Sequence, residues 1–130
     1  MNDSEEQNNF EVEETSTDIV EEMPQEEQHE GQEELPEEQL NEISELSKRG
    51  YQLLKENLIN DAEDCFRQIL EYDDVNNYAL VGLGDAARKR GDFRKAISYY
   101  QQCLENHEGN NYALFGLADC YKALNRYTDA

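Results

Sequence analysis

The sequence predicts an all-α protein in which antiparallel helix pairs stack in a linear array behind an acidic tail. Three observations support this fold class. The decapeptide NNYALVGLGD begins at Asn76 and returns as NNYALFGLAD at Asn110, 34 positions later, with eight of ten positions identical. Apolar residues in both copies follow the i, i+3, i+7 rhythm of an amphipathic helix. Residues 1–42 hold 17 of the 31 acidic residues and no Lys or Arg. Self-similarity at a fixed period of this length indicates a repeat architecture.

The first part of the chain is predicted to be a disordered acidic tail over residues 1–36, followed by one helical domain over residues 37–130. Its Glu, Gln, Asn and Ser cannot bury enough apolar area to offset the entropy of ordering it. The tail either only keeps the protein soluble or folds back as a regulatory element. In the second case it would lie on a basic rim formed by Arg88, Lys89, Arg90, Arg94 and Lys95.

Five helices are expected, over residues 36–56, 58–72, 77–90, 93–106 and 111–124. The first should begin at Pro36, whose fixed φ suits the first helical position, and Glu37 and Glu38 suit the helix dipole there. A sixth helix is expected to begin near Tyr127.

The turns inside the helix pairs are predicted from three residues 34 apart, Asn57, Gly91 and Asn125. Gly and Asn tolerate the left-handed backbone conformation in which many helices end. Asp92, directly after Gly91, is expected to cap the next helix through its carboxylate.

Small and aromatic residues recur with the same period. Gly50, Gly84 and Ala118 fall in register, and an aromatic residue, Phe66 or Tyr100, follows 16 positions after each glycine. We therefore expect each pair of helices to pack closely. The aromatic residues Phe66, Tyr100 and Tyr121 are predicted to lie in the core, as are the cysteines Cys65, Cys103 and Cys120.

These residues resemble the tetratricopeptide repeat (TPR), a 34-residue motif of the form Trp-x2-Leu-Gly-x2-Tyr, Ala-x3-Phe, Pro. The second copy reads Leu80-x2-Leu83-Gly84-x2-Ala87 and then Ala96-x3-Tyr100. The chain departs from the motif because it lacks Trp and has Asp74 and Glu108 in place of the closing Pro. The resemblance implies a right-handed α-solenoid of about two and a half repeats, over residues 43–76, 77–110 and 111–130, the last truncated.

No arrangement of residues predicts catalysis, so the chain is not expected to be an enzyme or to hold a cofactor or metal. His29 and His107 have no ligand-spaced companions, and the three cysteines match no metal or redox pattern. The net charge of -20 argues against a nucleic-acid partner, because such proteins carry basic surfaces. Without a secretory signal or an apolar span, the chain is predicted to be cytoplasmic and not bound to a membrane.

A binding surface is the function that remains. The resemblance implies a non-catalytic scaffold that binds a partner protein or peptide in a concave groove lined by the first helix of each pair. The groove positions are Tyr51, Leu54, Tyr78, Val81, Asp85, Arg88, Tyr112, Phe115, Asp119 and Lys122.

Two features of this groove are open to a second interpretation. Tyr78 and Tyr112 could anchor the partner or pack between adjacent repeats. Gly82 and Gly116 could admit the backbone of a neighbour or simply relieve crowding.

Two further expectations concern partners and the end of the array. Some TPR domains hold the C-terminal carboxylate of heat-shock chaperones with Lys and Asn. The matching positions here, Ser47, Tyr51, Gly82, Tyr112 and Gly116, form no cationic pocket, so that ligand is not predicted. Because the array stops inside a repeat, helix 111–124 should expose apolar surface, through which head-to-tail self-association could occur. The alternative to a free-standing scaffold is the N-terminal interaction module of a longer protein with a catalytic domain downstream.

Overall fold

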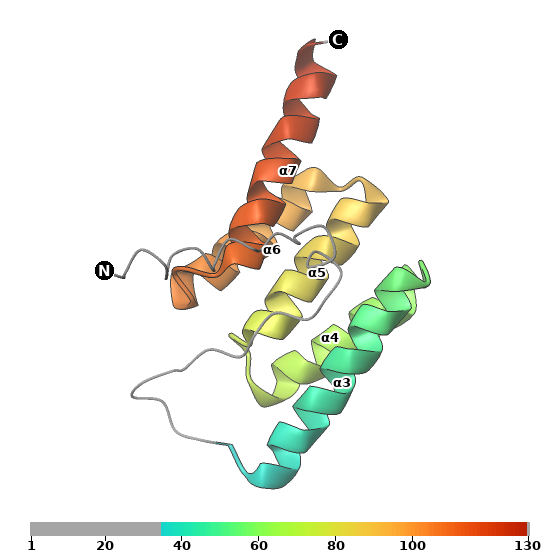
Figure 1. Ribbon diagram of the computed structural model, residues 1–130, viewed down its shortest axis with the longest axis vertical. Coiled ribbons are helices and arrows are strands. Elements are labelled where there is room, and N and C mark those ends of the chain that lie inside the picture. Colours follow the sequence, from blue (N-terminus) through green and yellow to red (C-terminus); the bar gives the residue numbers. More distant parts are fainter. Residues whose placement is uncertain (1–34, 130) are drawn as a thin grey trace, which may run out of the picture.

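The structure, a computed structural model, describes residues 35–129, except for the side chains of residues 127–129. The described residues form five α-helices and no strand, as predicted (Figure 1). The helices are α3 (Glu37–Lys55), α4 (Ile59–Tyr72), α5 (Asn77–Arg90), α6 (Phe93–Asn106) and α7 (Asn111–Asp129). The predicted acidic tail, residues 1–36, lies almost entirely outside the described residues.

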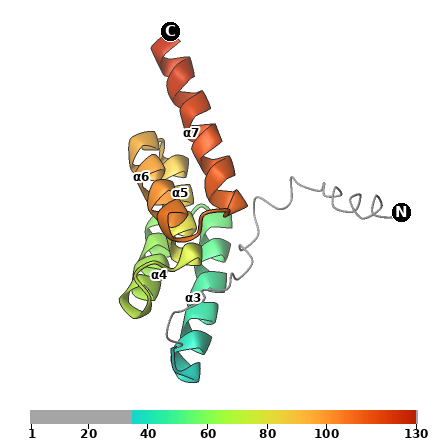
Figure 2. The same ribbon diagram turned by 90° about the vertical axis from the view of Figure 1, so that its left-hand side faces the viewer.

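The helices form a linear array of pairs. α3 packs against α4 and α5 packs against α6, while α7 packs against α6 and, more lightly, against α5. The first helices of the pairs, α3, α5 and α7, therefore follow one another along one side of the molecule. Figure 2 shows α4 and α6 on the other side, with α7 projecting beyond its neighbours.

Two of the three predicted turns are present. Asn57 (φ 63°) and Gly91 (φ 86°) adopt the left-handed conformation between the helices of the first and second pairs. The prediction for Asn125 was wrong, because α7 continues through this position to Asp129 and no separate sixth helix begins near Tyr127. Asn permits a left-handed turn but does not require one, and within the described residues no helix follows α7 against which a turn would pack.

Side-chain caps fix the beginnings of three helices. The Asn76 side chain accepts a hydrogen bond from the backbone N–H of Ala79 at 3.0 Å, and Asn110 repeats this cap on Ala113 at 2.9 Å. Asp92 caps α6, as expected. Pro36 stands one position before the first helical residue rather than at it, so α3 begins at Glu37. The first Asn of each repeated decapeptide is thus a helix N-cap.

The aromatic ring of each second helix sits between two glycines of the flanking first helices. A Cβ atom placed on Gly50 or Gly82 would lie 2.6 or 2.4 Å from the Phe66 ring. Tyr100 occupies the same position between Gly84 and Gly116, where a Cβ would lie 2.5 or 2.3 Å from its ring. Of the two interpretations of Gly82 and Gly116, relief of crowding is therefore the one observed, because these glycines admit a ring and not a neighbouring backbone.

The core consists of two apolar clusters, one for each complete pair. Phe66 and Ile69 lie in the first, and Tyr100 and Cys103 in the second, all with no exposed side-chain surface. All three cysteines are buried and free, as expected for core-filling thiols. Leu70 and Tyr99 pack against both clusters, which joins the two pairs into one continuous core.

The outer face of α7 is exposed, as predicted for the last helix of the array. Leu80 in α5 is 2% exposed, whereas its equivalent Leu114 in α7 is 45% exposed. Ala87 is 2% exposed, and its equivalent Tyr121 is 49% exposed, so the prediction that Tyr121 lies in the core was wrong. α6 covers this face of α5, and no described helix covers it on α7.

We predict that Gly82→Ala destabilises the protein although Ala is the better helix former. The new Cβ would overlap the Phe66 ring, and overpacking of this kind typically costs about 1–3 kcal/mol, against a helix-propensity gain of about 1 kcal/mol. Urea unfolding followed by circular dichroism measures the difference in the free energy of unfolding.

Gly109→Ala is the matched control, because no atom lies within 4 Å of the position that its Cβ would occupy. A second test combines Gly82→Ala with Phe66→Leu in a double-mutant cycle, in which the smaller side chain should recover part of the loss. Equal stability of the Gly82→Ala and Gly109→Ala variants would contradict the ring-and-glycine packing.

Candidate partner-binding surface

The ten predicted groove residues all lie on the first helices of the pairs. α3 carries Tyr51 and Leu54, α5 carries the middle four, and α7 carries the remaining four. These helices follow one another in the array, so the ten positions share one side of the molecule. The structure gives them three different environments: core, polar network and open surface.

Three of the predicted groove residues are buried. Tyr51 is 7% exposed, Leu54 4% and Val81 1%. The Tyr51 ring packs edge-on against Phe66 with 5.0 Å between ring centroids, and its hydroxyl donates a hydrogen bond of 2.8 Å to the backbone carbonyl of Tyr78. Burial raises the pKa of the Tyr51 hydroxyl well above its ordinary value, so it stays a donor. These three side chains therefore stabilise the packing of the first helices and present little contact surface.

The two repeated tyrosines are half-buried. Tyr78 packs against the first core cluster and Tyr112 against the second. Of the two interpretations given by the sequence, packing between repeats is therefore part of their role. Each side chain still has an accessible portion.

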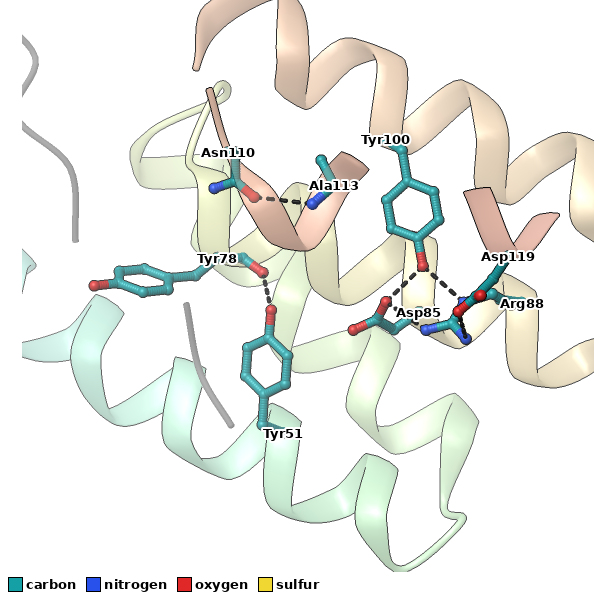
Figure 3. A network of polar contacts seen from close by, with 8 residues as sticks. All are labelled: Tyr51, Tyr78, Asp85, Arg88, Tyr100, Asn110, Ala113 and Asp119. Carbon is teal, nitrogen blue, oxygen red and sulfur yellow. Dashed lines mark hydrogen bonds and ion pairs between the residues drawn. The ribbon is translucent and has the colours of Figure 1, made fainter. Parts of the chain in front are cut away.

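Asp85, Arg88 and Asp119 form a network with the core residue Tyr100 (Figure 3). The Tyr100 hydroxyl donates to an Asp85 carboxylate oxygen at 2.5 Å, and Arg88 Nε donates to the Tyr100 oxygen at 3.0 Å. The Arg88 guanidinium also forms ion pairs with Asp85 at 3.2 Å and with Asp119 at 3.4 Å. Asp85, Arg88 and Asp119 were predicted to line the partner-binding groove, and in the structure their contacts with one another and with Tyr100 also connect α5, α6 and α7.

Burial controls the ionisation of this network. It raises the pKa of the Asp85 carboxyl, and the positive charge of Arg88 and the hydrogen bond from Tyr100 only partly oppose the shift. Burial and the neighbouring carboxylate also raise the pKa of the Tyr100 hydroxyl, which therefore remains a proton donor. The network thus holds one carboxylate in a poorly hydrated position between a phenol and a guanidinium.

The open part of the predicted surface lies on α7. Phe115 is 62% exposed, the Asp119 side chain is 51% exposed, and Lys122 is exposed. These three residues are spaced i, i+4 and i+7, so they share one face of the helix. Together they offer an apolar ring, an acid and a base.

The predicted basic rim is smaller than its sequence suggests. Arg88 is paired within the network, and Arg90 contacts Glu63 and Asn60 of α4. Lys89, Arg94 and Lys95 remain exposed, and no ion pair joins them to an acid among residues 35–126. The rim therefore provides three open charges and not five.

The burial of several polar residues, His107 and Ser47 among them, was not foreseen from the sequence. His107 is 4% exposed, and its Nε2 atom lies 2.7 Å from the backbone carbonyl of Val75, so it ties the end of α6 to the loop before α5. Ser47 is fully buried, and its Oγ has no hydrogen-bond partner among the described residues. The only feature of the sequence that could have indicated the burial of His107 is its position directly after the last residue of α6. That position does not distinguish a buried histidine from an exposed loop histidine.

The described residues contain no group of three or more His, Cys, Asp or Glu residues that could hold a metal ion. Within the same part of the chain, no helix has the length and apolarity needed to cross a bilayer.

Comparison with known proteins identifies the repeat. The sequence profile of the tetratricopeptide repeat matches residues 48–93 and again residues 81–130. The chain belongs to the tetratricopeptide repeat family. No curated protein matches it in sequence.

Solved structures support the TPR fold. One of the chains that match is the second TPR of Spaghetti (RPAP3) bound to the HSP90 peptide SRMEEVD. The TM-score is 0.61 at 18% sequence identity, and the match covers 70% of this chain and 86% of the other. At this identity the similarity concerns the arrangement of the TPR helices.

We predict that Asp85 makes the stability of this TPR array depend on pH. Its folded-state pKa is raised by burial, so the folded protein retains a proton that the unfolded chain has already lost. The contribution to the free energy of unfolding is therefore most favourable below the ordinary Asp range and falls as pH rises through the raised pKa. Urea unfolding at a series of pH values should show a smaller fall for Asp85→Asn than for the wild type.

Asp64→Asn serves as the control, because this α4 side chain is 71% exposed. It should leave the pH dependence of unfolding close to that of the wild type. Identical pH profiles for the Asp85→Asn variant and the wild type would show that Asp85 does not bind its proton more tightly in the folded state.

Proposed function

We propose that this protein is a non-catalytic TPR scaffold that binds an extended segment of a partner protein along the open face of α7 and the adjacent edge of α5. The observation that carries the proposal is the exposure of Phe115. Its equivalent one repeat earlier, Val81, is 1% exposed, whereas the Phe115 ring is 62% exposed. A large apolar side chain exposed in this way is typical of an interface anchor.

The neighbouring residues define the chemistry of the segment. An apolar side chain of the partner would pack on Phe115 and on the accessible part of Tyr112. Lys122 would attract a carboxylate or a backbone carbonyl, and Asp119 would accept a hydrogen bond from a backbone amide or a basic side chain. We expect a peptide with an apolar anchor and mixed polar flanks, bound without a dedicated pocket for a terminal carboxylate.

The peptide in the RPAP3 complex is not the ligand we propose for this chain. SRMEEVD carries three acids and would require unpaired cations. Arg88 already pairs with Asp85 and Asp119, and Ser47, at a matching position, is fully buried.

The three cysteines are relevant to the cellular compartment in which the protein acts. All three thiols are free and buried, which fits the reducing environment of the cytoplasm. We propose that the protein binds its partner in that compartment.

A peptide selection tests the binding function. We would pan the full-length protein against a phage-displayed peptide library and measure the affinity of the selected peptides by fluorescence anisotropy. Phe115→Ser and Lys122→Glu should each weaken binding at least about tenfold, the effect of losing about 1.4 kcal/mol. Both side chains are exposed, so the helices should remain folded.

The matched controls lie on the second helices. Tyr72→Ser removes an exposed aromatic side chain from α4, and Lys95→Glu reverses an exposed charge on α6. Both should bind the selected peptides like the wild type. A library that yields no peptide, or peptides that Phe115→Ser and Lys122→Glu leave unaffected, would refute the proposal.

A separate titration concerns the chaperone peptide. We predict that SRMEEVD gives no saturable binding to this protein in isothermal titration calorimetry, because the matching positions among the described residues carry no cation to hold its carboxylates. Saturable binding that is lost in Lys122→Glu would show that a single lysine can replace the expected cationic pocket.

A further inference from the structure

The outer face of α7 is an apolar strip with basic residues on one edge. Of the six exposed large apolar residues in the described chain, three lie on this helix: Leu114, Phe115 and Tyr121. Ala118 lies between them and is also exposed. Lys122 and Arg126, both exposed, follow the Phe115 edge of the strip. We call these six residues the α7 strip.

The fold itself shows what kind of element covers such a strip. The equivalent face of α5, with Leu80, Gly84 and Ala87, is covered by α6, an antiparallel amphipathic helix. α6 presents Ala96, Ile97 and Tyr100 at spacing i, i+1 and i+4. An occupant of the α7 strip therefore needs an apolar stripe with helical spacing, and the basic edge favours acids beside it.

One segment of this chain has both properties. Residues 12–23 contain Val12, Ile19, Val20 and Met23, at spacing i, i+7, i+8 and i+11, which places all four on one face of a helix. Ile19, Val20 and Met23 reproduce the i, i+1, i+4 spacing of α6. The other face of the segment is rich in acids, and Pro24 would end the helix directly after Met23.

We propose that residues 12–23 fold into an amphipathic helix on the α7 strip of the same molecule and cover it until a partner displaces them. The segment is one of those outside the described residues. Acids at the margin of its apolar stripe would lie beside the strip edge that carries Lys122 and Arg126, and residues 1–42 contain no base that would be repelled there. This docking position differs from the basic rim on α5 and α6, where Arg88 and Arg90 are already paired.

The connecting chain is long enough. Leu35 follows Met23 by twelve positions, and a fully extended chain of that length spans about 40 Å. α5 contacts both α3 and α7, so α7 lies two helix spacings from α3, or about 20 Å. The connecting chain can therefore span the lateral distance between the two helices.

Covering by the same molecule is favoured over covering by a second copy. A short flexible tether gives an effective concentration in the millimolar range, far above the concentration of the protein itself. Each copy carries a net charge of -20, which opposes pairing of two chains, whereas the acidic segment is attracted to the basic edge of the strip. Head-to-tail pairing is disfavoured further because Leu40 is the only exposed large apolar residue that the described part of α3 offers, and acids surround it.

Hydrogen exchange in the full-length protein tests the proposal. Ile19→Ser with Val20→Ser should remove the apolar stripe, and the amides of α7 should then exchange severalfold faster than in the wild type, as measured by mass spectrometry. Phe10→Ser is the matched control, because Phe10 falls on the face opposite the stripe in the same helical register. It should leave the exchange of α7 unchanged.

A fluorescence measurement provides an independent readout. The chain has no Trp, so Phe115→Trp introduces a single reporter in the strip. Its emission should shift to longer wavelength when Ile19 and Val20 are replaced by Ser, and should not shift with Phe10→Ser. The emission of the Phe115→Trp protein should also stay constant on dilution.

Three results would overturn the proposal. The first is equal α7 exchange in the wild type and in the Ile19→Ser, Val20→Ser variant. The second is an indole emission of the Phe115→Trp protein that responds equally to the stripe and control substitutions. The third is α7 protection that increases with protein concentration, which would assign the strip to a second copy. None of these measurements uses a peptide ligand. Their outcome therefore does not depend on whether the proposed partner binding is correct.

Discussion

The structure depends on the seating of one aromatic ring between two positions that lack a Cβ atom. Phe66 of α4 touches Gly50 of its own pair and Gly82 of the next pair. The contact therefore sets the separation within a pair and the separation between pairs at once. Tyr100 repeats the arrangement between Gly84 and Gly116. Because the same ring makes both contacts, the pairs are coupled to their neighbours, as expected for a stacked repeat protein.

The identity of the ring also determines the polarity of the first helices around it. Phe66 has no hydroxyl, and the nearby positions in α3 are Tyr51, which packs against the ring, and Leu54. One repeat later the ring is Tyr100, and the same two positions hold Asp85 and Arg88, which contact its hydroxyl. The polar network on α5 is thus a consequence of one oxygen atom in the core, which would be costly to bury without partners.

Most of the fold could be predicted from the sequence because its signals are local. Helix boundaries fell within one residue of the structure where Asn57 and Gly91 end a helix by their own backbone preference. The role of Gly82 could not be predicted, since it depends on the rotation of α4 that brings Phe66 over it. Asn125 shows the limit of a local signal, because a turn also needs a following element on which to pack.

The candidate surface was harder to predict for a related reason. Val81 and Phe115 occupy the same place in two nearly identical decapeptides, yet one is 1% exposed and the other 62% exposed. The difference in exposure arises from the position of each helix in the array. A local sequence pattern contains no information about that position. The geometry expected for the TPR family places both residues in a groove. Only the packing of a neighbouring helix determines which of the two side chains is accessible to a partner.

The polar network connects the open surface to the core. Asp119 is half exposed on α7 and pairs with Arg88, which in turn contacts Tyr100 and Asp85. A ligand that draws Asp119 away leaves Arg88 with Asp85 as its one remaining carboxylate partner in the network. Arg88 would then share its positive charge with Asp85 alone, which would favour the ionised form of Asp85, whose pKa burial otherwise raises. Ligand binding to the α7 surface should therefore lower the pKa of Asp85 in α5. The effect acts through Arg88 and requires no movement of the helices.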